Sequence, residues 1–322
     1  MDAINTMNLD QYCAWLGRKP ATHQKPYYAM YSSQFDAIVT DPRLMQVPVD
    51  DHLVHRGDGI FETLKCHEGA IYNLEQHMAR LVRSAERIQL PLPCGIDEIR
   101  QRVIETTRAG GQRNSLVRLI LSRGPGGFSV DPYECIGTQL YIVIYAEQGA
   151  FMHRKPAGAS AAVSDIPVKP SFFATIKTCN YLPNALMKKQ AVDRGVDFVI
   201  GVDDRGYLTE GPTENLCIVT EDGTLVRPPD EYILIGTTMQ RGIALAEQIT
   251  QIKVHPFTVN DVLKAREALI FGTSTDVTAV VEFEGQQIGS GTPGPVWRQL
   301  HELLIKEIAE HPEFRTDVFS GN

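Results

Sequence analysis

The sequence predicts an α+β protein made of two domains. At 322 residues, the chain is long enough to form two hydrophobic cores. Strand and helix patterns occur in both halves, without the regular alternation that builds a doubly wound parallel sheet. Between the halves, residues 148–158 contain glycine and proline and show no hydrophobic period. We therefore expect an N-terminal extension at 1–35, a small domain at 36–147, a linker at 148–158 and a larger domain at 159–322.

The first predicted domain combines short strands with an amphipathic helix. From Tyr27, the stretch YYAMYSSQFDAIV alternates apolar segments with turn residues, which indicates strands. The segments SLVRLILSRG (115–124) and TQLYIVIYA (138–146) are also typical of strands, because they are short, apolar and rich in β-branched residues. A helix is predicted over 74–88, where apolar residues recur at helical spacing. These residues are Leu74, Met78, Leu81, Ala85 and Ile88.

The second predicted domain begins with a strand at SAAVSDIP (160–167) and continues with a helix over 183–194. Gly195 is expected just beyond the end of this helix, where glycine is favoured. Two hairpins follow, with turns at 204–206 and 221–223. The remaining predicted elements are a helix after Gly236, a strand at 267–275 and a helix from Pro295.

The composition is that of an ordinary globular protein and argues against several kinds of partner. The net charge of −8 and the isoelectric point near 5.6 argue against binding to nucleic acids or acidic membranes. No apolar run approaches the roughly 20 residues that cross a bilayer, and the first residues lack the pattern of an export signal. The six cysteines form no CxxC pair. We expect reduced thiols, no metal site and a cytoplasmic location.

Lys177 is the first candidate for chemistry. It lies in FATIKTCNYLPNALMKKQ (172–189), beside Ile176 and Cys179 and close to Tyr181. An apolar setting removes water from an ammonium group, which lowers its pKa and makes a nucleophilic amine available. Alternatively, the aliphatic stem packs while the charged end reaches water. The residue alone does not decide between these interpretations.

Glu210 is the second candidate. In GYLTEG (206–211), the period of a strand places Glu210 on the same face as Leu208. If that face is buried, the carboxylate needs a partner, which is either an arginine or a protonated ring nitrogen of a cofactor.

Two Gly-Thr corners are candidates for anion binding. Gly236, Thr237 and Thr238 begin a predicted helix, where free N–H groups favour an anion; Thr238 is also explained as a simple N-cap. The second corner, Gly272-Thr273-Ser274, ends a strand and is equally explained as a turn.

Arg80 shares a helix face with Arg83 and Arg87, so a solvated basic face is the simple interpretation. SRGPGG lacks the GxxxxGK[ST] pattern of a nucleotide-binding loop.

The order and spacing of five blocks resemble the class IV (fold type IV) pyridoxal-phosphate aminotransferases. The likeness covers residues from about 28 to 305, and the N-terminal part looks closest to the plant-type D-amino-acid transaminase and aminodeoxychorismate lyase group. The resemblance implies a two-domain fold with pyridoxal 5′-phosphate in the cleft between the domains. The blocks are HRGDGIFETLKCHEGAIYNLEQHMARL, IKTCNYLPNAL, LTEGPTENLCIV, LIGTTMQR and FGTSTDVTAVVEFEGQQIG.

The resemblance also implies a role for each candidate residue. Lys177 matches the family lysine that joins the cofactor as a Schiff base and moves the substrate proton. Glu210 matches the carboxylate that keeps the pyridine nitrogen protonated. Asn215 would support the loop after Glu210, and Leu234 would cover one face of the ring. Tyr181 matches a tyrosine near the phenolic oxygen, although the spacing from Lys177 is one residue shorter than in branched-chain enzymes. The phosphate positions are matched by Arg80, Gly236, Thr237, Thr238 and Thr273.

Substrate contacts are implied with less support. Arg118 matches an arginine that contacts acidic side chains in branched-chain enzymes, and a structural ion pair is the alternative. Phe61 would line the pocket, while Gly272 and Ser274 would offer N–H groups to the α-carboxylate. The loop SRGPGGFSVDP lacks the Arg-x-His carboxylate trap of bacillus-type D-amino-acid aminotransferases. Phe128 and Glu62 depart from the bacterial lyases, which have arginine and threonine there.

The resemblance implies a transaminase with a ping-pong mechanism, acting on D-amino acids or on a broad range of amino acids and 2-oxo acids. Aminodeoxychorismate lyase, which releases pyruvate and 4-aminobenzoate, is the first alternative. A branched-chain amino-acid aminotransferase is the second. Because members of the family are homodimers, a homodimer is also expected.

Overall fold

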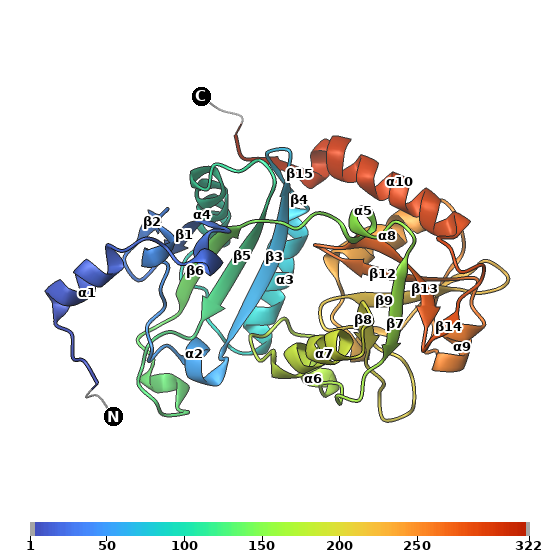
Figure 1. Ribbon diagram of the computed structural model, residues 1–322, viewed down its shortest axis with the longest axis horizontal. Helices are drawn as coiled ribbons and strands as arrows, with labels where there is room; N and C mark the ends of the chain where they lie inside the picture. Colours follow the sequence, from blue (N-terminus) through green and yellow to red (C-terminus); the bar gives the residue numbers. More distant parts are fainter. Residues whose placement is uncertain (1–3, 320–322) are drawn as a thin grey trace.

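The protein consists of two β-sheets that lie side by side, each covered by helices (Figure 1). The computed structural model describes residues 4–319. The first sheet has seven strands in the order β15-β4-β3-β5-β6-β1-β2, and all of their pairings are antiparallel. Its strands are β1 (Tyr27–Ser32), β2 (Ala37–Val39), β3 (Gly59–His67), β4 (Ala70–Tyr72), β5 (Ser115–Ser122), β6 (Gln139–Tyr145) and β15 (Arg315–Asp317).

Two helices, α3 (Leu74–Arg87) and α4 (Ile96–Ala109), pack on one face of the first sheet. Their apolar residues join Ile60 and Leu64 of β3 in one buried core. The prediction of a helix over 74–88 is confirmed to within one residue. The sequence analysis did not predict α4, although Ile99 and Val103 are buried one turn apart on it. The helices that precede α3 are α1 (Leu9–Leu16) and α2 (His52–Arg56).

The second sheet has the strand order β11-β10-β9-β12-β13-β7-β8, with β14 paired to β13. It is mixed, because β7 lies parallel to β8 and β13, and β10 lies parallel to β11. Its strands are β7 (Ala159–Val163), β8 (Phe198–Ile200), β9 (Asn215–Val219), β10 (Leu225–Arg227), β11 (Ile252–Val254), β12 (Glu267–Gly272), β13 (Asp276–Phe283) and β14 (Gln286–Gln287).

Three helices of the second half were predicted from the sequence, and three were not. The predicted helix over 183–194 is shifted by one residue, and Gly195 has the positive φ of 68° expected beyond a helix end. The predicted α-helices are α7 (Leu182–Asp193), α8 (Thr237–Ala246) and α10 (Pro295–Glu310), whereas α5 (Phe151–Arg154), α6 (Ser171–Ala174) and α9 (Val259–Leu263) were not predicted. Short 3₁₀ turns are η1 (Thr22–Gln24), η2 (Pro42–Leu44), η3 (Pro132–Glu134), η4 (Asp230–Tyr232) and η5 (Pro312–Phe314).

The strand predicted to contain Glu210 is reduced to isolated bridges. Leu208 pairs with Val202, and Glu210 pairs with Asn215, but no continuous ladder forms. Gly211 and Pro212 follow at once, and proline cannot donate to a ladder. The carboxylate of Glu210 is therefore held at the end of an irregular segment, close to the start of β9.

The α+β fold with two domains is confirmed. The chain passes from the first sheet to the second in residues 148–158, where it forms the short helix α5. Strands β1 and β15 complete the first sheet from outside the range 36–147. The predicted domain bounds stay a proposal, which limited proteolysis of the linker would test. Within the described residues, no helix is both long and apolar enough to span a membrane.

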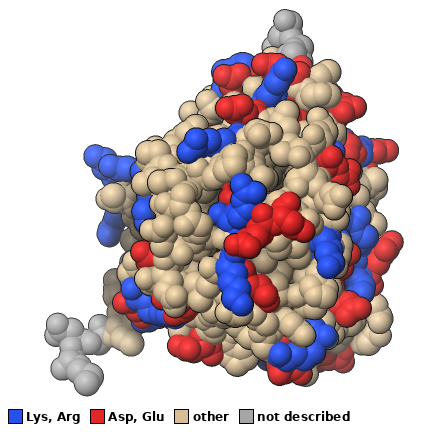
Figure 2. All heavy atoms as spheres, turned by 90° about the vertical axis from the view of Figure 1, so that its right-hand side faces the viewer, with Lys and Arg blue, Asp and Glu red and all other residues tan. Residues whose placement is uncertain are grey.

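Charged side chains are mixed on the face shown in Figure 2. Basic and acidic residues lie next to one another there, and neither sign forms a broad continuous area.

Inside the molecule, the two halves are joined by buried polar contacts. Lys65 Nζ on β3 lies 2.5 Å from Asp276 Oδ1 on β13. The hydroxyl of Tyr72 on β4 donates to Glu307 Oε1 on α10 at 2.5 Å.

Candidate active site

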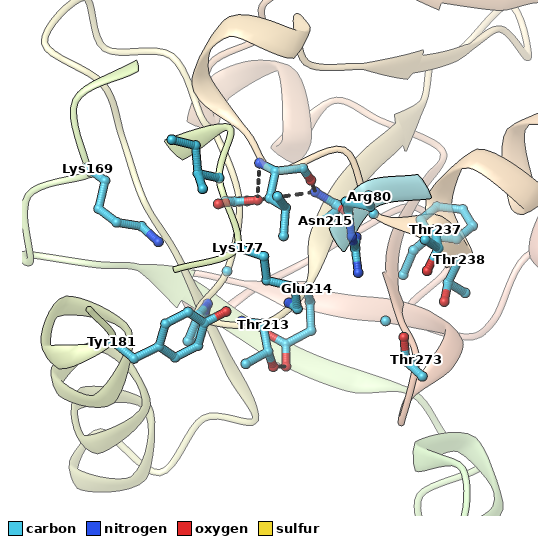
Figure 3. Close-up of a pocket in the computed structure, with 18 residues that line it drawn as sticks. Arg80, Lys169, Lys177, Tyr181, Thr213, Glu214, Asn215, Thr237, Thr238 and Thr273 are labelled. Carbon is cyan, nitrogen blue, oxygen red and sulfur yellow. Dashed lines mark hydrogen bonds between the residues drawn. The ribbon is translucent and has the colours of Figure 1, made fainter. Parts of the chain in front are cut away.

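A cleft between the two halves contains most of the predicted site residues (Figure 3). About 490 Å³ of empty space lies between its walls, part of which is open to solvent. One wall comes from α3 of the first half, and the others come from segments of the second half. The predicted residues that line it are Arg80, Lys177, Tyr181, Glu210, Asn215, Leu234, Gly236, Thr237, Thr238, Gly272 and Thr273.

Lys177 is fixed by pairing between its backbone and the first sheet. Phe61 N donates to Lys177 O at 3.0 Å, and Cys179 N donates to Gly59 O at 2.8 Å. This extended pairing directs the side chain into the cleft, where Nζ lies 4.7 Å from the centre of the Phe61 ring. Burial, followed by the nearby guanidinium of Arg80, lowers the pKa of Lys177 to about 7. A large fraction of this amine is neutral at pH 7, as a nucleophile requires.

Glu210 faces Lys177 across the cleft with a partly satisfied carboxylate. Leu234 N donates to Glu210 Oε2 at 2.9 Å, and Asn215 Nδ2 lies 3.3 Å from the same oxygen. Asn215 Nδ2 also donates to Leu234 O at 2.8 Å, which holds this turn in place. Burial raises the pKa of Glu210 to about 7. A cationic N–H donor brought to this carboxylate would favour its ionised form.

The opposite end of the cleft offers a cluster of N–H and hydroxyl donors. Helix α8 begins at Thr237, and its N-cap, Gly236, provides no side-chain hydrogen bond to the first N–H groups. Thr238 is the second residue of the helix, so the simple interpretation of Thr238 as an N-cap is wrong. Thr273 approaches from the turn between β12 and β13. Such a helix start favours an anion.

Arg80 lies at the same end of the cleft as the start of α8. Its environment shows that the simple interpretation from the sequence, a solvated basic face, is wrong. The side chain is buried, and Nε and Nη2 donate to Glu62 Oε1 and Oε2 at 2.8 and 2.6 Å. Nη1 donates to Ile235 O at 3.1 Å, just before Gly236. The guanidinium is therefore attached both to β3 and to the turn that begins α8.

The structure does not bring every predicted substrate residue into the cleft. Phe61 lies beside it, because its ring stacks edge-on against Tyr181 with centroids 5.0 Å apart. Arg118 also contacts that ring, with Cζ 4.5 Å from its centre. It lines a separate hollow and contacts the Tyr145 hydroxyl at 3.4 Å, which is a weak hydrogen bond rather than an ion pair. Ser274 is exposed outside the cleft.

Three polar residues that the sequence analysis missed also line the cleft: Lys169, Thr213 and Glu214 (Figure 3). Lys169 Nζ lies 5.1 Å from the centre of the Tyr181 ring, and burial lowers its pKa. The sequence could have pointed to Lys169, because this lysine lies between Pro167 and Pro170 in a loop that precedes Lys177. Burial raises the pKa of Glu214, which follows Glu210 after one tight turn.

The fold and the cleft define a protein of the class IV aminotransferases. The family model "Amino-transferase class IV" matches residues 59–283, so the chain belongs to this family. Its members are enzymes that depend on pyridoxal 5′-phosphate, and the predictions of family, enzyme class and cofactor are confirmed. Transamination is likewise supported, while the particular substrate is not resolved.

Individual relatives differ in their named substrates. The chain is 37% identical over 301 residues to the chloroplastic D-amino-acid transaminase of Arabidopsis thaliana, covering 91% of this chain and 80% of the relative. It is 30% identical to the D-alanine aminotransferase of Staphylococcus haemolyticus, covering 83% of this chain and 94% of the relative. Among solved structures, the branched-chain aminotransferase of the archaeon Thermoproteus uzoniensis with norvaline matches with a TM-score of 0.83 and 25% identity. That match covers 91% of this chain and 100% of the other.

Proposed function

We propose that this aminotransferase exchanges amino groups between D-amino acids and 2-oxo acids, with Lys177 as the reactive lysine. The observation that supports it most is that the Lys177 amine, the Glu210 carboxylate and the donor cluster at the start of α8 line the same cleft. The preference for D-amino acids is supported by the relatives named for D-amino-acid and D-alanine transamination.

The residues of the cleft fit pyridoxal 5′-phosphate by their chemistry. A neutral amine suits its aldehyde, a buried carboxylate suits its ring nitrogen, and an uncapped helix start with an arginine suits its phosphate. Lys177 would hold the aldehyde carbon and Glu210 the ring nitrogen, with Asn215 supporting Glu210. Leu234 would cover the ring, and Tyr181 would lie near its phenolic oxygen. The phosphate would be held by Arg80, Gly236, Thr237, Thr238 and Thr273.

The residues of this chain then perform the proton transfers. When bound, pyridoxal phosphate supplies an aldehyde that condenses with amines and a ring that withdraws electron density from the substrate Cα. Lys177 Nζ takes the Cα proton, because its lowered pKa makes it a base near neutral pH. Lys177 would then return the proton, and with a second 2-oxo acid as amino acceptor the same amine would act first as acid and then as base. The Glu210 carboxylate would accept a hydrogen bond from the protonated ring nitrogen.

Substrate recognition would involve residues around the Phe61 ring. We retain Phe61 as part of the substrate wall, because its ring lies close to both the Lys177 amine and the Arg118 guanidinium. Arg118 would bind a substrate carboxylate that reaches past this ring. Gly272 lies in the cleft and would offer its N–H group to the α-carboxylate, whereas Ser274 would act only from its backbone, since it lies outside the cleft.

The assembly and location are also proposed. We expect a homodimer in which each copy closes the site of the other, and light scattering would test it: a mass equal to the 35.8 kDa of one chain would contradict the dimer. A cytoplasmic location would be tested by cell fractionation, because the relative from Arabidopsis thaliana is named as chloroplastic.

A comparison of amino donors tests the proposed reaction. The enzyme is incubated with 2-oxoglutarate and D-alanine, L-alanine or L-leucine, and the enantiomers of the glutamate formed are resolved by chiral chromatography. We expect D-glutamate from D-alanine and much slower reaction with both L-amino acids. Faster reaction with L-leucine would instead identify a branched-chain aminotransferase. Release of 4-aminobenzoate from aminodeoxychorismate, without transamination, would identify a lyase.

A further inference from the structure

A buried chain of hydrogen bonds lies behind the donor cluster at the start of α8. Glu62 on β3 accepts from Arg80 through both carboxylate oxygens, and His77 Nδ1 lies 2.7 Å from Glu62 Oε2. On its other side, His77 Nε2 lies 3.2 Å from the hydroxyl of Thr237. All four side chains are at most 7% exposed. The chain therefore joins the first sheet, helix α3 and helix α8.

The protons in this chain have one consistent arrangement. The guanidinium of Arg80 outweighs the effect of burial and keeps the pKa of Glu62 well below its usual range, so this carboxylate only accepts. His77 Nδ1 must then hold the hydrogen. Burial lowers the pKa of His77, which leaves the ring neutral and Nε2 free to accept. The Thr237 hydroxyl therefore donates to His77, and its hydrogen points away from the cleft.

Arg80 is oriented by the same carboxylate. Two of its five N–H groups bind Glu62 and a third binds Ile235 O. The two remaining N–H groups belong to Nη1 and Nη2, the terminal nitrogens of the side chain that lines the cleft. The paired bonds to Glu62 fix the plane of the guanidinium, because a bidentate pair restricts rotation more than a single bond.

We propose that Glu62 and His77 are positioning residues for the phosphate group of the cofactor. Glu62 orients Arg80 directly and orients Thr237 through His77. As a result, Thr237 binds the phosphate through its backbone N–H, whereas Thr238 donates its hydroxyl. This inference rests on the proposed function, which assigns the start of α8 to the phosphate.

Binding of pyridoxal 5′-phosphate and of pyridoxal, which lacks the phosphate, tests the role of Glu62. Both bind covalently to Lys177, so the absorbance of the bound form gives each affinity. Glu62→Gln should weaken binding of pyridoxal 5′-phosphate at least about tenfold, because Arg80 loses its charged partner. Binding of pyridoxal should change by less than about twofold, since it does not reach Arg80. Equal weakening of both compounds would overturn the proposal.

Tyr72→Phe serves as the matched control for damage to the fold. Tyr72 donates to Glu307 between the same two halves but does not line the cleft, and Arg241 remains paired with Glu307 after the change. This variant should lower the melting temperature without changing the ratio of the two affinities. If Glu62→Gln behaves in the same way, the positioning role is rejected. If the unmodified enzyme binds both compounds equally well, the phosphate assignment itself fails.

The role of His77 is tested by variants of the two threonines. Thr238→Ala removes a proposed phosphate donor and should weaken binding of pyridoxal 5′-phosphate about tenfold. Thr237→Ala keeps the backbone N–H and should have a smaller effect. The changes caused by His77→Ala and Thr237→Ala should not add, because both break one hydrogen bond, while those of His77→Ala and Thr238→Ala should add. A Thr237 effect as large as that of Thr238 and independent of His77 would contradict the proposal.

Discussion

At the level of single residues, the cleft sets the ionisation of two groups on which the chemistry depends. About half of Lys177 is neutral near pH 7, because burial next to Arg80 lowers its pKa to about 7, and the pKa of Glu210 is raised toward neutral pH by burial. In water, the ordinary pKa values of lysine and glutamate lie far apart. Both values move to about 7 here because of the tertiary surroundings. Each shift suits the proposed role. The neutral Lys177 amine can attack the cofactor aldehyde, and the Glu210 carboxylate becomes ionised when a cationic N–H donor approaches it.

The pH dependence of cofactor binding tests the state of Lys177. The reactive form is the neutral amine, and its fraction increases as pH rises through the pKa of about 7. The rate at which cofactor-free enzyme combines with pyridoxal 5′-phosphate should therefore increase through about pH 7 and then level off. Stopped-flow absorbance measures this rate, with Lys177→Ala as the variant that shows no covalent phase. An increase centred near the ordinary lysine value of 10.5 would contradict this prediction.

Replacement of Glu210 by Gln tests the contact with the ring nitrogen. The amide cannot hold a proton on that nitrogen, so electron withdrawal from the substrate Cα is weakened. We expect the single-turnover rate with D-alanine to fall about 100-fold or more, with the covalent bond to Lys177 still formed. Unchanged turnover by Glu210→Gln would remove Glu210 from the mechanism.

At the level of helices and strands, two connections position the site. Residues 177–179 pair with β3, so Lys177 is held by the sheet of the other half. The turn before α8 is held on one side by Asn215 and on the other by Arg80. A Cβ atom on Gly236 would overlap the Asn215 side-chain oxygen, so this turn requires glycine for its close approach rather than for an unusual φ.

Gly236→Ala should therefore weaken the cofactor site. The methyl group displaces Asn215 or the start of α8, and we expect a loss of about 1–3 kcal/mol in unfolding free energy together with weaker binding of pyridoxal 5′-phosphate. Denaturant unfolding and absorbance titration measure the two effects. The control is Gly95→Ala, where a Cβ atom meets open space and φ is already −60°. Equal behaviour of the two variants would show that the turn tolerates a side chain.

Across the whole molecule, buried polar contacts fix how the two halves meet. Lys65 and Asp276 are both buried and belong to different sheets, and Asp276 directly follows the turn that contains Thr273. Each charge is tolerated only because the other is present, since an unpaired buried charge is costly. This pair thus links the relative position of the halves to the shape of the cleft.

Asp276→Asn should destabilise the enzyme by about 3–5 kcal/mol, because the Lys65 ammonium is left buried without its partner. The double variant Lys65→Met with Asp276→Asn should recover most of this loss, since no uncompensated charge remains. Urea unfolding of the unmodified enzyme, Asp276→Asn, Lys65→Met and the double variant gives the free energies. If the double variant is as unstable as the sum of the single variants, the two residues are not energetically coupled.

Local sequence patterns were sufficient to predict the α+β class, many of the strands and four of the longer helices. A hydrophobic period predicted α3, which buries one face along its length, while Pro183 and Gly195 indicated the two ends of α7. Lys177 and Glu210 were candidates because an apolar setting around a charge is visible in neighbouring residues, and their roles came from the resemblance to the family. The simple interpretation of Arg80 failed because its partner, Glu62, lies on another element, among the core residues Ile60 and Leu64 of β3.

Which side chains meet in the cleft could be learned only from the packing of distant segments. Arg118 was expected in the cleft, but it lines a separate hollow on the sheet face that it shares with Phe61, and its distance along that face keeps it out of the cleft. Lys169 enters the cleft through the path of a loop, which has no period in the sequence. The chain from Glu62 through His77 to Thr237 joins β3 and α3, which are close in the sequence, to α8, which lies 160 residues beyond His77. Such contacts depend on how sheets and helices pack over long distances, and local patterns do not encode that packing.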